Sequence, residues 1–283
     1  MKNDQIDRKT IVSALDWQAT MGADEAVGET VADWAAYDMP DWWQELKGQP
    51  VASRPVPPAA PVKFDPLTAN AKVDAPPLQL FTAPVAVTIT AQTLEELAAE
   101  FKAFEGVGLK KTAMNFVFGE GNPAKRIMLI GEGPGADEDR QGRPFVGRSG
   151  QLLDRMLAAI GLNSREDYYI TNVTPWRPPG NRTPTDTEIT LLRPFLVRHI
   201  ELVNPAVIVT LGGLATKTLL DNSAGITRLR GKFLKLKLDN FAADIPLLPL
   251  FHPAALLRNP AQKQQSWADL LTLKKFLLEH KLL

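Results

Sequence analysis

With 283 residues, 45% of them hydrophobic, the chain is long enough for one medium-sized domain with an extension, or for two small domains. The absence of cysteine excludes disulfides, thiolate metal sites and cysteine nucleophiles. The presence of only three histidines argues against a histidine-rich metal site. The formal charge is zero, but residues 1–92 hold 7 Lys+Arg and 12 Asp+Glu, a net of −5, whereas residues 93–283 hold 25 and 20, a net of +5. A mildly basic body is suited to contact with a polyanion. An ordinary distribution of charged residues over the surface would explain the same net charges equally well.

Residues 1–92 have the composition of an acidic extension. Short stretches with helical apolar spacing occur over residues 11–36 and 41–46, and a segment rich in Pro and Ala, residues 50–84, predicts an extended linker. The tryptophans of this part could dock an unknown protein partner or pack on the body. The N-terminus shows no signal peptide and no apolar run reaches the length of a membrane span, so we expect a cytoplasmic protein without membrane association.

The body, residues 93–283, alternates helices and strands. It begins with a capping box, Thr93 to Glu96, ahead of an apolar helical stripe. Further helices are predicted over residues 149–161, 185–203, 213–220 and 267–280, and strands over residues 126–130, 168–171, 206–211, 233–238 and 246–250. This order predicts a doubly wound α/β sheet. The carboxyl ends of its parallel strands would bring together three loops, residues 131–150, 172–182 and 252–260.

The first of these loops combines a glycine-rich turn with an acidic run. Gly131, Gly133 and Gly135 follow a buried strand and would let backbone N–H groups approach a ligand, although an ordinary strand-to-loop connection also fits. We expect Asp137 and Asp139 to be solvated. No Gly-Lys-Ser/Thr follows, which argues against a P-loop. A nucleotide-binding α/β hydrolase or transferase nevertheless stays open as an alternative.

Several motifs then occur in a characteristic order: GEGPGADED, GRPFVG, TNV, RPPGNR, VTLG and HPAALLRNP. Over residues 93–283 this chain resembles the family 4 uracil-DNA glycosylases. The resemblance implies a three-layer α/β/α fold with a central four-stranded, mainly parallel sheet. It also implies a monofunctional hydrolase of base excision repair, which cleaves the N-glycosidic bond of deoxyuridine in DNA. We expect a monomer that acts on uracil-containing DNA at the nucleoid. A non-catalytic uracil-DNA binder is a second alternative.

Family members usually hold a 4Fe–4S cluster on four cysteines, and this chain departs from that pattern. The matching positions are all apolar: Phe104, Val107, Trp176 and Leu191. We therefore expect no metal and no cofactor, with packed side chains in place of the cluster.

The resemblance also assigns roles in binding the base. Phe145 would stack on a flipped-out uracil, and Asn172 would bond its O4 and N3–H. His252 would bond O2 and stabilise the negative charge on the leaving base. Each residue also has a structural interpretation: a core phenylalanine, a turn-forming asparagine at a strand end, and a structural histidine.

Other roles are less determined. Glu132 or Glu138 would position the hydrolytic water, and Asn181 would hold that water or support the site. Related families carry aspartate at the position of Gly133. One known relative bonds covalently to DNA through a histidine in an inserted basic loop. Residues 176–185 contain no histidine and no such insert, so we expect turnover.

The last motif supplies contacts to the DNA itself. By resemblance, Leu256 or Leu257 would wedge into the duplex while Arg258 contacts a phosphate. Arg182 fits a phosphate contact and a plain surface charge equally well.

Overall fold

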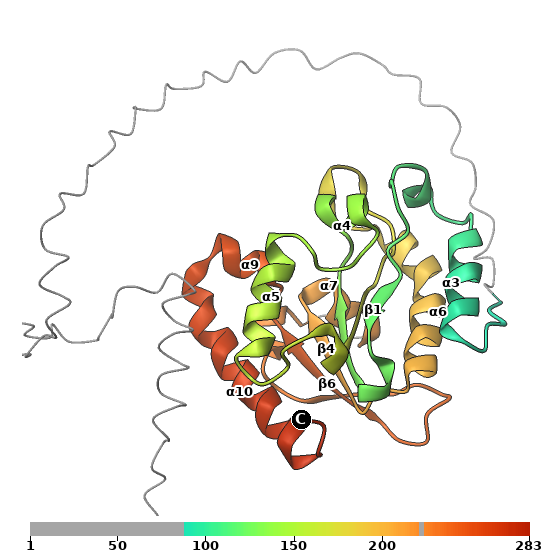
Figure 1. Cartoon of the computed structure of the whole chain (residues 1–283). Coiled ribbons are helices and arrows are strands. Elements are labelled where there is room, and N and C mark those ends of the chain that lie inside the picture. Colours follow the sequence, from blue (N-terminus) through green and yellow to red (C-terminus); the bar gives the residue numbers. More distant parts are fainter. Residues whose placement is uncertain (1–87, 221–223) are drawn as a thin grey trace, which may run out of the picture. The chain divides into compact units, whose positions relative to one another are not determined.

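The computed structural model describes residues 88–220 and 224–283, which Figure 1 draws as coloured ribbon. The stretches predicted to be helical or a linker within residues 1–87 lie outside the described residues. In the described part a six-stranded sheet lies between helices, which confirms the α/β class.

The sheet has a parallel centre and antiparallel edges. Its strands are β1 (Gly119–Gly121), β2 (Ile127–Gly131), β3 (Tyr169–Asn172), β4 (Val207–Leu211), β5 (Leu234–Leu236) and β6 (Ile245–Leu250), in the order β1-β3-β2-β4-β6-β5. The four central strands are parallel, and β1 and β5 pair antiparallel at the two edges. The expected four-stranded sheet is therefore correct for the parallel centre, and the strand predicted over residues 233–238 is the edge strand β5, so only the edge β1 was missed. β1 escaped prediction because Gly-Glu-Gly is short and shows no apolar alternation.

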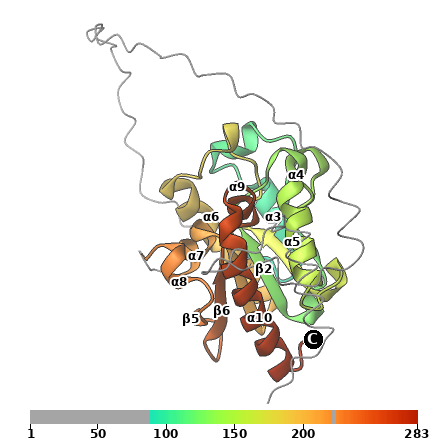
Figure 2. The same cartoon turned by 90° about the vertical axis from the view of Figure 1, so that its left-hand side faces the viewer.

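Helices cover both faces of the sheet, which gives the expected three layers (Figure 1). One face carries α5 (Arg148–Ala158), α9 (Pro253–Arg258) and α10 (Lys263–Glu279), and Figure 2 brings α9 and α10 to the front. The other face carries α6 (Asp186–Val203) and α7 (Gly213–Leu219), with α3 (Leu94–Ala103) packed on α6. Among the described helices, none combines the length and apolarity needed to cross a bilayer.

The strand β2 shows why the middle of the sheet is apolar on both sides. Ile127 and Leu129 contribute to the core under α5 and α10, whereas Met128 and Ile130 contribute to the core under α6 and α7. Because successive strand residues point to opposite faces, a strand buried on both sides must be apolar throughout. This continuous run is what made the strand predictable.

The acidic run after β2 forms a short helix that was not predicted, α4 (Ala136–Gln141). Its first turn carries Asp137, Glu138 and Asp139, where carboxylates interact favourably with the helix dipole. The predicted capping box is confirmed at Thr185, whose hydroxyl accepts from Glu188 N–H while the Glu188 carboxylate accepts from Thr185 N–H. At Thr93 only half of the box forms, since the hydroxyl accepts from Glu96 N–H but the Glu96 carboxylate accepts from the backbone N–H of Gln92.

A third apolar cluster lies outside the two faces of the sheet. It contains the four positions that the resemblance matches to cluster-binding cysteines: Phe104, Val107, Trp176 and Leu191. In this cluster Phe101 stacks on Phe195 with ring centroids 4.2 Å apart, and its edge meets Trp176. Leu192 is fully buried there, whereas Leu191 is partly buried. The cluster joins α3 and α6 to the loop after β3, so apolar packing connects the segments.

Candidate active site

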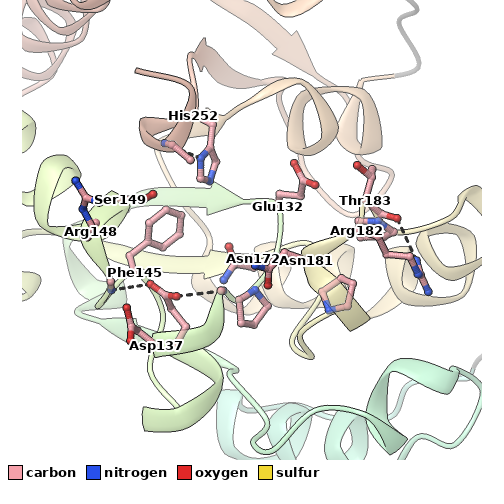
Figure 3. Close-up of a pocket in the computed structure, with 18 of the residues that line it drawn as sticks. Glu132, Asp137, Phe145, Arg148, Ser149, Asn172, Asn181, Arg182, Thr183 and His252 are labelled. Carbon is pink, nitrogen blue, oxygen red and sulfur yellow. Dashed lines mark hydrogen bonds between the residues drawn. The ribbon is translucent and has the colours of Figure 1, made fainter. Parts of the chain in front are cut away.

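A cavity of about 570 Å³ opens where the parallel strands end (Figure 3). All three loops predicted to converge contribute to its lining. The predicted site residues on the lining are Glu132, Gly133, Glu138, Phe145, Asn172, Asn181, Arg182, His252 and Arg258. Leu256 and Leu257 are not on it.

The inner end of the cavity is formed around Gly131, at the last position of β2. A Cβ atom on Gly131 would lie 2.4 Å from Asn172 Oδ1 and 2.4 Å from Phe145 Cζ, so only glycine leaves room for both side chains. The ring of Phe145 is tilted 32° to that of His252, with centroids 5.9 Å apart. The three residues expected to bind the base therefore surround one space.

Asn172 ends β3 and is only 5% exposed. Its Oδ1 is buried and has no hydrogen-bond partner in the described part of the chain. Leaving a buried amide oxygen unpaired costs about 1–3 kcal/mol, so such atoms call for an explanation. A turn-forming role does not supply one, because that role would pair the oxygen with a nearby backbone N–H. An acceptor facing a cavity instead fits a ligand that donates an N–H.

His252 is the N-cap of α9. Its Nδ1 accepts a hydrogen bond from the backbone N–H of Ala254 at 3.1 Å, which assigns the proton of the neutral ring to Nε2. Burial, with a smaller contribution from the nearby Arg258 cation, lowers the pKa of His252 to about 4. The ring is therefore neutral at pH 7, and its one N–H donor is Nε2–H. Figure 3 shows the ring pointing into the cavity.

The two glutamates predicted to position water differ in their contacts. Glu138 is 8% exposed, and its carboxylate accepts hydrogen bonds from the backbone N–H groups of Gly147 at 2.8 Å and Gly135 at 3.1 Å. It thus joins two glycine turns, and both oxygens are already engaged. The Glu132 carboxylate accepts no hydrogen bond within the described residues. Burial raises its pKa, against the opposing effect of Arg258.

The expectation that Asp139 is solvated is wrong. Asp139 is 2% exposed, and its Oδ1 accepts hydrogen bonds from the backbone N–H groups of Met114 at 2.8 Å and Asn115 at 3.0 Å. It fixes the preceding loop to α4. Asp137 agrees better with expectation, since it is partly exposed and pairs with Arg140 on the same helix.

Asn181 and Arg182 lie at the rim of the cavity, each with a protein partner. Asn181 Oδ1 accepts a hydrogen bond from Arg177 Nε at 2.7 Å. Arg182 makes a two-pronged pair with Glu188, at 2.7 and 2.8 Å, and this contact is the main reason why the pKa of Glu188 falls to about 2. The pair holds the guanidinium in place and offsets part of its charge.

The segment expected to be a wedge loop is the helix α9, which separates the two leucines. Leu256 is fully buried in the core shared with α5 and α10, so it could enter DNA only by unpacking. Leu257 is 38% exposed, and Arg258 lines the cavity. Because Leu256 is buried and its neighbour Leu257 is exposed, Leu257 is the better candidate for the wedge.

Thr174 is a site residue that the sequence did not single out. It is fully buried, and its hydroxyl lies 3.4 Å from the backbone oxygen of Glu132. A Cβ on Gly133 would come within 2.5 Å of this hydroxyl oxygen, so a side chain at this position would require Thr174 to move. Arg148 and Ser149 also line the cavity, and only their nearness to the GRPFVG motif could have marked them.

The residues present do not fit the iron–sulfur cluster that the family resemblance implies. Apolar side chains occupy its four positions, and they offer no ligand atom. Within residues 88–220 and 224–283, no group of three His, Asp or Glu side chains could hold a metal ion.

Comparison with known proteins agrees with this geometry. The model of the uracil DNA glycosylase superfamily matches residues 118–271. The chain is 38% identical over 182 residues to the type-4 uracil-DNA glycosylase of Archaeoglobus fulgidus, covering 63% of this chain and 90% of that protein. It is 43% identical over 172 residues to the type-4 uracil-DNA glycosylase of Thermotoga maritima, covering 60% and 86%. The chain therefore belongs to the uracil DNA glycosylase superfamily and, within it, to the type-4 uracil-DNA glycosylases.

Proposed function

We propose that this protein is a monofunctional uracil-DNA glycosylase that removes uracil from DNA and leaves an abasic site. The observation that carries the proposal is the buried, unpaired Oδ1 of Asn172, which lies beside the ring of Phe145 on the cavity that His252 also lines. Release of free uracil from a single-uracil oligonucleotide tests it, since a non-catalytic binder would retain the base in the strand.

The base would be read on its Watson–Crick edge after it is flipped out of the stack. Asn172 Oδ1 accepts from uracil N3–H, and its amide N–H₂ donates to O4. Cytosine presents the opposite pattern, an acceptor at N3 and a donor at N4, so an amide held in this orientation rejects it. The ring of Phe145 supplies a stacking surface that tolerates any base, which leaves discrimination to the amide.

The chemistry would separate charge across the bond from C1′ to N1. As the bond breaks, its electron pair moves onto uracil, and His252 Nε2–H stabilises the charge at O2 without giving up its proton. Glu132, whose carboxylate is on the cavity lining, would balance the positive sugar and orient water for attack at C1′. Water adds to C1′, and its released proton passes to Glu132 and then to solvent.

We expect the acid limb of the pH–rate profile to belong to Glu132. In the proposed mechanism, Glu132 must be ionised to orient water, and His252 must be neutral. Burial raises the pKa of Glu132 from its usual value and lowers that of His252 to about 4, so an acid limb is expected from the carboxylate. Single-turnover rates between about pH 5 and 8 should therefore fall on the acid side in the wild type and lose this limb in Glu132→Gln. An unchanged limb in the variant would contradict the assignment.

Contacts to the DNA are proposed for the exposed residues around the mouth. Leu257 would insert beside the vacated position, with Arg258 on a neighbouring phosphate. Arg182, fixed by Glu188, would contact a second phosphate at the opposite rim. Asn181 would support the water or the sugar from the same rim.

We further propose that the enzyme works without a metal or cofactor, the third apolar cluster taking the structural place of the iron–sulfur cluster. The purified protein should be colourless, contain no iron and keep its full excision rate in EDTA. Iron analysis and an excision assay with chelator check this. Loss of activity in EDTA that an added metal restores would show that a metal site exists.

The remaining assignments follow from where the proposed residues lie. All of them fall between Glu132 and Arg258, so we assign excision to the domain of residues 93–283. We further propose that this domain acts as a monomer. A substrate in genomic DNA supports a cytoplasmic location at the nucleoid. We propose that residues 1–92 bind an unidentified protein partner.

A further inference from the structure

Phe145 holds a backbone conformation that bulky residues rarely adopt. Its φ is 54°, in the left-handed region where a side chain crowds the following carbonyl. Such conformations persist only where the surroundings impose them, and they gather at functional sites. The contacts that hold this backbone therefore also fix where the stacking ring lies.

Two contacts meet at the carbonyl oxygen of Phe145. Gly150, in the first turn of α5, allows a close approach, since a Cβ there would lie 1.8 Å from this oxygen. Arg165, in a short 3-10 turn (Arg165–Asp167) before β3, donates a hydrogen bond from Nη2 to the same oxygen at 2.9 Å. Gly150 therefore leaves room for the Phe145 carbonyl oxygen, and Arg165 donates a hydrogen bond to it.

Arg165 is itself held from several sides. Its guanidinium pairs with Asp154 of α5 at 3.1 Å and lies 5.6 Å from the ring centre of Tyr168, whose hydroxyl donates to the same Asp154 at 3.2 Å. Its Nη1 is buried and has no hydrogen-bond partner among residues 88–220 and 224–283. A buried, unpaired N–H is unfavourable, so fold stability alone explains this arginine poorly. Arg165 does not line the cavity, and its contact with the site runs through Phe145.

We infer that Arg165 is a positioning residue for uracil excision, which holds the strained turn that presents the Phe145 ring to the base. The inference rests on the proposed stacking role of Phe145. Because stacking depends on the placement of the ring, a small shift of this turn lowers the rate without removing any group that touches uracil.

A double-mutant cycle separates this role from a general effect on folding. Arg165→Met should slow single-turnover excision by about tenfold in the wild-type protein, and by less than twofold when Phe145 is already alanine. Arg155→Met, an exposed arginine on α5, is the matched control and should leave the rate unchanged. Arg165→Lys, which keeps the cation beside Asp154 but loses the planar fork, should fall in between and serves if the methionine variant does not fold.

The results test two claims separately: the positioning role of Arg165 and the stacking role of Phe145. If Arg165→Met slows excision equally in both backgrounds, or not at all in the wild type, the positioning role is overturned. If Phe145→Ala alone leaves excision unchanged, the proposed stacking role fails, whatever Arg165 does. Thermal denaturation of each variant identifies any loss that comes from unfolding.

Discussion

Replacing His252 with alanine should slow single-turnover excision of uracil by about 10²–10³-fold, the usual effect of removing one preorganised donor to a developing anion. The ring is neutral, with a pKa of about 4, and in the proposed mechanism its Nε2–H would donate to O2, where charge builds. Abasic-site DNA carries no such charge, so its affinity should stay nearly unchanged. Single-turnover kinetics and titration with abasic-site DNA measure the two effects separately.

The side chain of His252 also caps α9, so the alanine variant removes two interactions at once. His252→Asn is the matched control, because asparagine caps helices well but places no N–H at the position of Nε2. Both variants should be similarly slow. Recovery in His252→Asn to within threefold of the wild type would assign the defect to the cap. A rate within threefold of the wild type for His252→Ala would overturn the site assignment.

Asn172→Asp should change which base is accepted. A carboxylate accepts from the amino group of cytosine but repels uracil O4, so uracil excision should fall by at least about 10²-fold while cytosine excision becomes measurable. Burial raises the pKa of an introduced carboxyl, and its protonated form could still donate to uracil, so the comparison belongs at about pH 8. The measurement is excision from oligonucleotides that differ only in that one base.

Asn172→Leu is the control for this change, since leucine has a similar volume and no polar atom. It should lose uracil excision without gaining cytosine. If the leucine and aspartate variants gained cytosine excision equally, the pocket would select the base by shape and not by hydrogen bonds. Uracil excision by Asn172→Asp at the wild-type rate would show that this amide does not read the base.

The central sheet and its helices could be predicted because their determinants are local. A parallel strand buried on both faces must be a continuous apolar run, as in Ile127 to Ile130, and each capping box is contained in four residues. The convergence of the loops then follows from parallel topology alone. The edge strand β1 carries no such mark, since its pairing with β3 depends on a strand 50 residues away.

The roles of the acidic residues could not be predicted because their partners are distant in sequence. Glu138 accepts from Gly147, and Asp139 accepts from Met114 and Asn115, so neither is the free carboxylate that its neighbours in the sequence suggest. Adjacent leucines posed the same difficulty, because burial of Leu256 and exposure of Leu257 depend on how α9 docks. The strained backbone of Phe145 has no sequence mark at all.

The most direct test of the account is incubation of the purified full-length protein with an oligonucleotide that carries one uracil, followed by alkali. The account predicts strand cleavage at the uracil position, release of free uracil, and no stable protein–DNA adduct. An intact strand at protein in excess over DNA, with the protein shown to be folded, would contradict the central claim that the cavity around Asn172, Phe145 and His252 excises uracil.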